Sequence, residues 1–490
     1  MINYATLVTF VVYFVFLMAV GIYFYRRTSN LEDYLLGGRG MGSWVTALSA
    51  QASDMSGWLL MGLPGAVYLW GIDQSWIAIG LGIGTFFNWL LVAPRLRMYT
   101  GKLHSMTLSG FLGDRFGDPS GLIRIISALI TLLFFTIYAS SGLVAAGKLF
   151  VAMFGMHYAL AVIVGAVVMI LYTFLGGFLA VCWTDLFQGL LMFMAIIIVP
   201  IVGLQHAGGV SVIGRSIAEK GLSTSLFTSG PGIAGIVAII STMAWGLGYF
   251  GQPHILARFM GIKSIKELPK AMTIAMIWVV ISLTGAVIVG LIGTAVVPGL
   301  SGGNEEKVFI LMIDGLFNPW LGGVLLAAIL AAIMSTIDSQ LLVSSSALTE
   351  DFYKHIIRKE ASDKELIWVG RSCVLIIALI ALLLALNPNS TVLGLVSYAW
   401  GGFGAAFGPA VLMALFSRKT GWQSILGGIV VGTVVLVIWK NLGLGSVMYE
   451  IVPGFLANFL TVFLLNFRFG QQNERILSEF DEVEQSIAKG

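Results

Sequence analysis

Two apolar segments of this sequence are interrupted by residues that could bind a small ion or solute. The first, ALSAQASDMSGWLLMGLPGA (47–66), carries the carboxylate of Asp54 among serines and glycines. The second, STMAWGLGYFGQPHILARF (241–259), holds Trp245 and has three glycines and Pro253 within eight positions. Glycine and proline at this density break a helix. Broken ends offer carbonyl oxygens that can hold a hard cation and N–H groups that can hold a carboxylate.

A third apolar segment, AAILAAIMSTIDSQLLVSSSALTED (327–351), contains a polar turn. Ser335 and Thr336 offer hydroxyl oxygens there, although lone hydroxyls in such helices usually bond back to the preceding turn. Asp338 follows them. An ionisable residue inside a span is functional by default, because a charge in the membrane is costly. The same argument applies to Asp185, which could instead lie at the membrane interface.

The composition explains why so few polar residues stand out. The chain has 490 residues, of which 58% are hydrophobic and only 10% are charged. A soluble domain of this size needs far more charge to cover its surface. A soluble globular protein, a disordered chain and a nucleic-acid binder are therefore excluded, and the net charge of +3 indicates no polyanionic partner. The sequence predicts an all-α polytopic membrane protein that contacts the lipid bilayer.

About 20 apolar residues cross a bilayer, and runs of this kind define about thirteen predicted transmembrane helices. They lie near 4–25, 43–70, 75–94, 122–152, 158–180, 184–204, 232–257, 271–297, 319–349, 368–386, 392–416, 421–440 and 448–467. The two interrupted segments are spans two and seven, five spans apart. Interrupted helices at matching places in two halves of a chain are the best sequence pointer to a transporter site. We therefore expect a five-plus-five core of inverted repeats, each opened by a broken helix.

The same count divides the chain into parts. These are a peripheral first span (1–30), the transporter core (31–416, with repeats at about 41–204 and 232–416), two peripheral C-terminal spans (417–467) and a cytoplasmic tail (468–490). No segment between the spans is long enough for a separate soluble domain. The tail is acidic in its last third, and we expect it to be either a short helix or disordered.

The basic residues predict the orientation of the chain. Cytoplasmic loops of membrane proteins carry the excess of lysine and arginine. With the N-terminus outside, 22 of the 27 basic residues fall on the cytoplasmic side. The other five are Lys148, Arg215, Lys220, Lys307 and Lys440. We therefore expect an outside N-terminus, a cytoplasmic C-terminus and a location in the cell membrane.

Several kinds of chemistry have no signature in the sequence. Two cysteines are too few for a disulfide framework or a four-cysteine metal site. We find no phosphate-binding loop, no zinc-protease motif and no nucleophile–base set. The sequence therefore predicts no enzyme, no catalytic residue, no transition metal and no cofactor, and it indicates no obligatory protein partner.

The interrupted segments resemble those of the sodium:solute symporter family, and the resemblance runs from about residue 33 to residue 467. Its other motifs are DYLLGGR (33–39) and SYAWGGFGAAFGP (397–409). The resemblance implies sodium-coupled secondary active uptake of L-proline by alternating access, with Na+ as the coupling ion. The alternatives are symport of another small solute, such as pantothenate or another amino acid, and coupling to protons. The two broken helices favour a gated site over a sodium channel.

The resemblance also implies roles for individual residues. It implies a sodium site made by the carbonyls of Ala52, Met55 and Ala332 and the hydroxyls of Ser335 and Thr336. It implies a solute pocket at Ser56, Gly57, Trp58, Tyr138, Trp245, Tyr249 and Pro253. It further implies that Asp54 matters for sodium-dependent transport, and that Arg39, at the cytoplasmic start of span two, acts in gating. Oxygen ligands suit Na+ because it is a hard cation.

Asp338 stands where members of the family vary. Together with Asp185 and Ser339 it could form a second cation or proton site, and a second ion would put a one-to-one ratio of sodium to solute in doubt. The alternative is a salt bridge or a hydrogen-bonded structural carboxylate. The sequence leaves both interpretations open.

Overall fold

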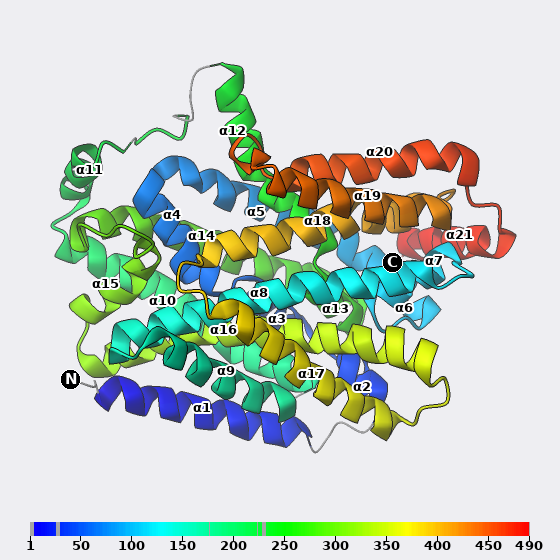
Figure 1. Ribbon diagram of the computed structural model, residues 1–490, viewed down its shortest axis with the longest axis horizontal. Coiled ribbons are helices and arrows are strands. Elements are labelled where there is room, and N and C mark those ends of the chain that lie inside the picture. Colours follow the sequence, from blue (N-terminus) through cyan, green and yellow to red (C-terminus); the bar gives the residue numbers. More distant parts are fainter. Residues whose placement is uncertain (1–3, 26–29, 176, 223, 228–231, 490) are drawn as a thin grey trace.

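The chain folds into a bundle whose long helices run side by side (Figure 1). The computed structural model describes residues 4–25, 30–175, 177–222, 224–227 and 232–489. The α-helices are α1 (Tyr4–Tyr25), α2 (Leu31–Leu36), α3 (Ser43–Asp54), α4 (Leu63–Trp70), α5 (Ser75–Phe87), α6 (Ala93–Leu103), α7 (Leu108–Phe116), α8 (Leu122–Phe154), α9 (Tyr158–Leu175), α10 (Phe178–His206), α11 (Val210–Glu219), α12 (Ile233–Met243), α13 (Pro253–Gly261), α14 (Leu268–Val296), α15 (Val308–Leu316), α16 (Pro319–Ser346), α17 (Asp363–Ala385), α18 (Val392–Phe416), α19 (Trp422–Asn441), α20 (Ile451–Phe469) and α21 (Glu474–Lys489).

Eleven helices in the described ranges are long and apolar enough to cross a membrane. They correspond to eleven of the thirteen predicted spans. The other two predictions, near 43–70 and 158–180, contain the shorter apolar helices Trp58–Trp70 and Tyr158–Leu171. The prediction near 43–70 yields a short helix because the chain leaves the helical conformation after Asp54. The structure is thus that of a multi-pass, all-helical membrane protein.

The third predicted span is longer than the sequence indicated. Its prediction ended at residue 94, but helical structure continues from Ile72 to Leu103 through α5, a π-helical turn at Asn88–Val92 and α6. Pro94 closely follows the π-helical turn, where the changed hydrogen-bond pattern accommodates a residue that has no N–H. The charged residues that follow Pro94 therefore belong to a helix end and not to a separate loop.

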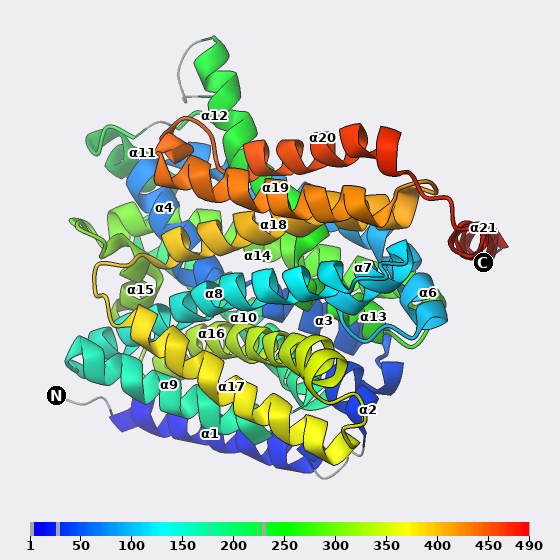
Figure 2. The ribbon, with the colours of Figure 1, turned by 45° about the vertical axis from the view of Figure 1, so that its right-hand side comes forward.

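The two ends of the described chain lie at opposite ends of the bundle. α1 begins at one end and α21 lies at the other in both views (Figure 1 and Figure 2). α19 and α20 lie side by side along one edge and pack against α18. Among the described long helices, α16 and α18 are the most buried, so they form the centre against which the interrupted segments pack.

The first interrupted segment breaks where small polar residues accumulate. α3 ends at Asp54, and Met55 leaves the helical conformation with φ −86° and ψ 75°. The N–H of Ser56 donates to the Asp54 carbonyl at 3.0 Å. A π-helical turn at Trp58–Gly62 then leads into α4. Because a helix end leaves its last carbonyl oxygens outside the regular ladder, those of α3 can face a neighbouring helix.

The second interrupted segment breaks over a longer stretch. After α12, a 3-10 helix covers Ala244–Gly251, and Gln252 is extended. Pro253 then begins α13, since proline is well tolerated in the first turn of a helix. A 3-10 helix of eight residues is unusually long, and 3-10 stretches within helices often mark functional hinges.

Glycines allow the backbone of the second break to pack directly against the backbones of neighbouring helices. A Cβ added to Gly246 would overlap the carbonyl oxygen of Gly80, and one added to Gly84 would overlap the carbonyl oxygen of Gly246. On the opposite side, a Cβ on Gly251 would overlap the carbonyl oxygen of Phe403. The 3-10 helix is therefore held between α5 and α18 by contacts that a larger residue would disrupt.

The C-terminal tail forms a helix, α21, that docks on the bundle through an apolar face. Leu477, Phe480 and Val483 are buried. Arg418, in the turn after α18, donates to both carboxylate oxygens of Asp481 at 2.8 and 2.9 Å. This contact lowers the pKa of Asp481. Of the two tail structures that the sequence left open, the helix is the one observed.

Candidate functional site

The hydroxyl pair on α16 lies against the end of α3. Ser335 Oγ donates to the Ala52 carbonyl at 2.7 Å and lies 3.2 Å from the Ala332 carbonyl. Thr336 Oγ1 lies 3.5 Å from the Ala52 carbonyl and 3.2 Å from the Ala332 carbonyl. All four residues are buried. The structure thus brings four of the five oxygens of the expected sodium site together between the first break and α16.

The fifth oxygen belongs to Met55, the residue at which the chain leaves α3. Met55 is buried, and its N–H donates to the Gln51 carbonyl at 2.9 Å. This bond closes the last turn of α3 and leaves the Met55 carbonyl in the break itself. The five expected ligands include no carboxylate. The set is therefore neutral and rich in oxygen, which suits a singly charged hard cation.

Asp54 connects the two breaks. The hydroxyl of Tyr249, in the 3-10 helix, donates to Asp54 Oδ2 at 2.5 Å. The Asp54 carbonyl accepts bonds from Trp58 Nε1 at 3.1 Å and from the Tyr138 hydroxyl at 3.3 Å. All four residues are buried. Hydroxyl–carboxylate bonds of this length are among the strong ones, so Asp54 positions the second break relative to the first.

Aromatic residues of the two breaks lie close together. The ring centroids of Trp58 and Trp245 are 6.3 Å apart, and the ring planes make an angle of 39°. Tyr138 reaches the same region from α8 through its bond to the Asp54 carbonyl. Aromatic faces pack against apolar rings and attract cations. This group can therefore bind an apolar body that carries a positive charge.

Ser56 and Gly57 form the turn between α3 and the π-helical stretch. Ser56 Oγ accepts the N–H of Trp58 at 3.3 Å. A Cβ on Gly57 would lie 3.0 Å from the Cβ of Ala145 and 3.3 Å from Cγ1 of Ile333. The turn is therefore packed tightly between α8 and α16, and a substituent on Gly57 would push these helices apart.

The residue before Pro253 ties the second break to α18. Gln252 Nε2 donates to the Trp400 carbonyl at 3.2 Å, and Trp400 Nε1 donates to the Trp245 carbonyl at 2.7 Å. The Trp400 ring also meets the Tyr249 ring edge-on at 5.0 Å. The sequence analysis did not select Trp400, although this tryptophan lies in one of the matched motifs. That motif is the signal that could have found it.

Asp185 is paired with an arginine. Arg258 Nη2 lies 3.1 Å from Asp185 Oδ2 and 2.5 Å from Ser339 Oγ, and Arg258 Nε donates to Ser49 Oγ at 3.0 Å. Ser49 Oγ in turn donates to Asp185 Oδ2 at 2.7 Å. All four residues are fully buried. A buried carboxylate needs an opposite charge or several donors, and Asp185 has both.

Arg258 is a residue that the sequence analysis misplaced. The charge count assigned it to a cytoplasmic loop near 258–270, whereas the structure buries it in α13. The available signal was its position, five residues after Pro253 in an apolar stretch. A buried guanidinium must find a carboxylate, so this position points to an acidic partner on another helix.

Asp338 lies at the edge of the same network. Ser339 Oγ, which accepts from Arg258, also lies 3.4 Å from Asp338 Oδ1. Asp338 is buried like its neighbours. The structure therefore brings Asp185, Asp338 and Ser339 together, but it places the guanidinium of Arg258 among them.

Arg39 joins three elements at one end of the bundle. Its guanidinium donates to the carbonyls of Thr100, Ser105 and Met260 at 3.1, 2.9 and 3.2 Å, and it pairs with Glu32 at 3.2 Å. Its backbone has φ 53°, a conformation that few residues other than glycine adopt. Arg39 thus links the segment before α3 with α6 and with α13, the helix that follows the second break.

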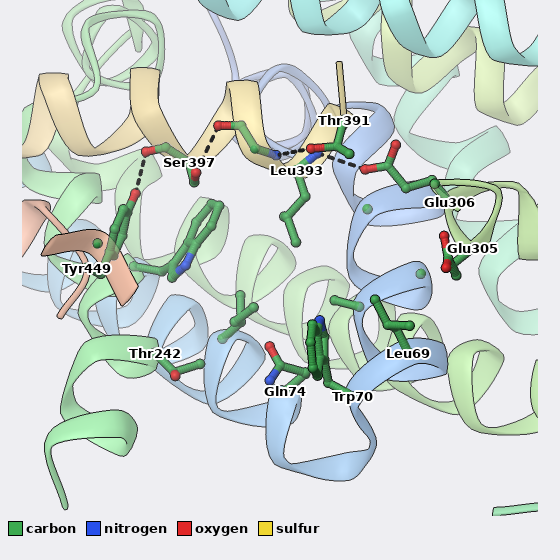
Figure 3. A pocket seen from close by; sticks show the side chains of 18 of the residues that line it. Leu69, Trp70, Gln74, Thr242, Glu305, Glu306, Thr391, Leu393, Ser397 and Tyr449 are labelled. Atoms are coloured by element: carbon green, nitrogen blue, oxygen red, sulfur yellow. Dashed lines mark hydrogen bonds between the residues drawn. The ribbon is translucent and has the colours of Figure 1, made fainter. Parts of the chain in front are cut away.

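A cavity of about 600 Å³, which we call the vestibule, opens beside the second break. Its walls include α4, the start of α18 and the turn between α19 and α20. Figure 3 shows Tyr449 and Ser397 on one wall and Glu305 and Glu306 on the opposite one. Trp245 lies in its lining, so the vestibule leads to one of the expected solute residues.

Two interrupted helices that meet at buried polar residues, inside a bundle of membrane-spanning helices, define a class of protein, the secondary transporters. The sequence profile of the sodium:solute symporter family matches residues 34–432. The chain belongs to this family, which confirms the prediction from its motifs. The family consists of transporters and not of enzymes.

The chain is also similar to individual curated proteins over nearly its whole length. It is 49% identical over 478 residues to the high-affinity proline transporter PutP of Bacillus subtilis (strain 168), covering 96% of this chain and 100% of that protein. It is 52% identical over 458 residues to the sodium/proline symporter of Escherichia coli (strain K12), covering 92% of this chain and 90% of that protein.

A solved structure shares the fold. It is a substrate-bound, outward-open state of a Na+-coupled sialic acid symporter, with a TM-score of 0.79 over 96% of this chain and 99% of that one. The two sequences are 21% identical. At this identity the likeness concerns the fold alone, and it agrees with an all-helical, polytopic transporter.

Proposed function

We propose that this protein takes up L-proline together with sodium by alternating access. The observation that carries the proposal is the oxygen cluster at the first break, where the hydroxyls of Ser335 and Thr336 each lie within 3.5 Å of two backbone carbonyls. Relatives that share about half of its residues are proline transporters by name.

Sodium binds between the first break and α16. The hydroxyls of Ser335 and Thr336 turn their lone pairs toward the ion, and the carbonyls of Ala52, Met55 and Ala332 complete the site. The ion then joins two helices that otherwise meet through hydrogen bonds. A ligand shifts a conformational equilibrium only as far as it prefers one state, and sodium prefers the state in which these five oxygens converge.

Proline binds between the two breaks. Its carboxylate lies at the Ser56–Gly57 turn, where a new helical stretch begins and offers N–H groups. Its ring and secondary ammonium group face aromatic side chains. The residues that complete the pocket are Trp58, Tyr138, Trp245, Tyr249 and Pro253. Asp54 acts on coupling without touching the ion, because it links the first break to Tyr249.

The sodium gradient and the membrane potential supply the energy for uptake. One elementary charge that moves through 100 mV contributes about 2.3 kcal/mol. Sodium favours the outward-open state, proline closes the outer side, and the core then opens to the cytoplasm. Arg39 gates the inner side, since it links the segment before α3 with α6 and α13.

The core consists of two inverted repeats in the cell membrane. The repeats cover about 41–204 and 232–416, and the spans in 1–30 and 417–467 are peripheral. The N-terminus lies outside and the tail, 468–490, lies in the cytoplasm. The positive-inside rule supports this orientation, and the position of α1 and α21 at opposite ends of the bundle is consistent with it.

One sodium ion accompanies each proline. Arg258 already supplies Asp185 with a positive charge at 3.1 Å. A second cation at Asp185, Asp338 and Ser339 would have to displace this guanidinium or share its carboxylate. We therefore assign these residues, with Arg258, to a buried ion-pair network, and a sodium:proline ratio of one is the expected result.

Uptake by purified protein in proteoliposomes tests the proposal. Labelled L-proline is expected to accumulate above equilibrium when sodium is high outside, and accumulation is expected to stop when choline replaces sodium. Parallel counts of labelled sodium and proline give the ratio. Accumulation driven by a proton gradient without sodium would assign the coupling to protons.

The solute is tested by competition in the same vesicles. Unlabelled L-proline is expected to block uptake of the label, whereas pantothenate and amino acids with open chains are expected to leave it unchanged. Strong competition by one of these compounds, with weak competition by proline, would move the protein to another solute within the same family.

A further inference from the structure

Another cavity, of about 340 Å³, adjoins the vestibule but has no part in the proposed transport cycle. It is bordered by the end of α8, the start of α9 and the turn between α17 and α18, and we call it the lysine pocket. Its lining includes Lys148, Tyr158, Lys307, Ser390 and Thr391. None of these residues belongs to the sodium site or to the solute pocket proposed above.

The charge of Lys148 is balanced by a carboxylate. Its Nζ lies 2.5 Å from Glu306 Oε2, and both side chains are buried. Glu306 also accepts the N–H groups of Val392 and Leu393, each at 3.0 Å, and Figure 3 shows it beside Thr391 at the start of α18. The start of a helix is its positive end. Glu306 therefore serves one lysine and one helix end, and the charge of a second lysine stays unbalanced.

That second lysine is Lys307, at the end of the 3-10 turn Glu305–Lys307. Its Nζ donates to the neutral Asn304 Oδ1 at 2.8 Å. Among the residues that the structure describes, no carboxylate forms an ion pair with it. Burial and repulsion from Lys148 lower the pKa of Lys307, so the two ammonium groups act on each other. The lysine pocket therefore holds positive charge in excess.

Two other lysines on the same side of the predicted membrane have partners that offset their charge. Lys440 Nζ lies 3.0 Å from Glu450 Oε1. Lys220 Nζ lies 3.3 Å from the centroid of the Tyr68 ring, where the aromatic face attracts a cation. Lys307 has only a neutral amide as its partner, and it lines a cavity. The excess charge is therefore a feature of this pocket and not of the whole surface.

The lysine pocket lies next to an apolar surface. The Tyr158 hydroxyl donates to the Ala385 carbonyl at 2.9 Å, which joins the start of α9 to the end of α17. Leu160 and Leu383, each two residues farther along these helices, are 53% and 69% exposed. α9 and α17 lie side by side (Figure 1 and Figure 2). In a membrane protein such exposed leucines face acyl chains, so the pocket lies where the acyl chains give way to head groups.

We propose that the lysine pocket binds the phosphodiester group of an anionic phospholipid, whose acyl chains lie against α9 and α17. Lys307 pairs with the phosphate, and the Ser390 hydroxyl donates to a second phosphate oxygen. Tyr158 lies at the level of the head group, where tyrosine is enriched in membrane proteins. Basic pockets between membrane-spanning helices bind anionic head groups in other proteins. This inference goes beyond the proposed function, since it requires neither sodium nor proline.

The size and position of the pocket favour a lipid over a free ion. A volume of about 340 Å³ lies in the range of sites for small molecules, about 300–1,000 Å³, and a single halide ion would leave most of it empty. A phospholipid also covers the exposed leucines beside the pocket, which a free phosphate ion cannot do. The lipid therefore satisfies both the charge and the apolar surface.

The experiment measures lipid binding to the full chain by native mass spectrometry. The purified protein is titrated with phosphatidylglycerol or with phosphatidylcholine of the same acyl chains, and the apparent Kd of the first bound lipid is recorded. Phosphatidylglycerol is expected to bind more tightly. Lys307→Gln is expected to weaken its binding about fivefold, the worth of one lysine beside an anionic lipid. Lys307→Arg is expected to keep the affinity. Lys220→Gln is the matched control, because it removes the same charge outside the pocket.

A second measurement separates the lipid from a free anion. In nanodiscs of phosphatidylcholine, added phosphatidylglycerol is expected to raise the unfolding temperature of the unmodified protein, and this rise is expected to shrink in Lys307→Gln. Inorganic phosphate in nanodiscs of phosphatidylcholine alone is expected to give no such rise. Equal unfolding temperatures of all variants in phosphatidylcholine alone show that each of them folds.

Three outcomes would overturn the inference. An unchanged affinity for phosphatidylglycerol in Lys307→Gln would show that the lipid does not use the pocket. An equal loss in Lys220→Gln would assign the effect to the overall surface charge. A rise in unfolding temperature with inorganic phosphate alone, absent in Lys307→Gln, would assign the pocket to a free anion. Each of these results is independent of proline uptake, so the proposed function would stand.

Discussion

The two broken helices differ in length and in the groups that they present. The first break leaves the helix at Met55 and offers backbone carbonyls to hydroxyls on α16. The second runs through eight residues of 3-10 helix and offers aromatic side chains. Asp54 lies where they meet and bonds to Tyr249. The end of α3 is therefore suited to an ion, and the second break adds aromatic surface that is suited to an organic solute.

The difference follows from what each ligand needs. A small ion needs several oxygens that converge at short distances, and a sharp end of one helix supplies them. A ring-shaped solute needs extended surfaces. With three residues per turn, a 3-10 helix places Trp245, Gly248 and Gly251 on the face toward α18. The alternate face, with Gly246 and Tyr249, is turned toward α5 and the first break.

The largest effect is expected when the hydrogen bond that links the two breaks is removed. Asp54→Asn removes the charge that holds the Tyr249 hydroxyl, and we expect the initial rate of proline uptake to fall about 100-fold, as for a lost buried charged bond. Tyr249→Phe removes only the donor and is expected to cost about tenfold. Uptake by Asp54→Asn within threefold of the unmodified protein would show that the breaks act independently.

The packing of the second break gives the next largest effect. Gly246→Ala places a methyl group against the carbonyl of Gly80, and such overpacking typically costs about 1–3 kcal/mol. We expect a lower unfolding temperature and uptake reduced about 30-fold. Gly82→Ala is the matched control on α5, since nothing lies within 4 Å of an added Cβ there. Equal losses in both variants would contradict the close approach of α5 to the 3-10 helix.

The oxygen cluster predicts a change in sodium dependence alone. Ser335→Ala or Thr336→Ala removes one ligand, and we expect the sodium concentration for half-maximal uptake to rise about tenfold, near the worth of one hydrogen-bonding group. Ser346→Ala removes a hydroxyl on the same helix that bonds to Leu342, and it should leave sodium dependence unchanged. The idea of an ion site at the first break fails if all three variants behave alike.

The aromatic residues of the second break predict a change in proline binding without a change in sodium dependence. Trp245→Phe replaces the indole by a smaller phenyl ring. We expect proline to bind about threefold to tenfold more weakly, the usual range for one aromatic contact. Sodium dependence should stay the same. Equilibrium binding of labelled proline at several sodium concentrations measures both quantities, and parallel losses in the two would indicate general damage instead of a pocket contact.

The smallest effect is expected at an ion pair that touches neither break. In the folded protein Arg418 lowers the pKa of Asp481, so this pair stabilises the fold above the ordinary pKa of an aspartate and loses its effect as the pH falls through the lowered value. Asp481→Asn should shift the unfolding temperature at pH 7 by less than about 2 °C, because both partners are exposed. Uptake should be unchanged. A large loss of uptake would give the tail a part in transport.

Much of the fold could be predicted because its signals are local. Apolar runs located the spans, and glycine and proline located both breaks. The expected sodium oxygens came from family motifs, and the structure places Ala52, Ala332, Ser335 and Thr336 together. The boundary near residue 94 was wrong, because the helical path continues past Pro94 by way of a π-helical turn.

The contacts that connect distant helices could not be predicted in the same way. Arg258 was counted as a loop residue, since nothing nearby in the sequence shows that Asp185, on another helix, is its partner. Trp400 was passed over for a similar reason. Its indole N–H donates to the carbonyl of Trp245, which lies 155 positions away in the sequence.

The sequence by itself determined that the chain crosses the membrane, where most of its spans lie, where two of them break, and which family the chain belongs to. These features depend on composition, periodicity and short motifs. The tertiary structure alone decided that Tyr249 bonds to Asp54, that Arg258 neutralises Asp185, and that Lys440 and Glu450 meet beside the second break. Such pairs depend on how separate helices pack, and helix packing brings together side chains that no local pattern relates.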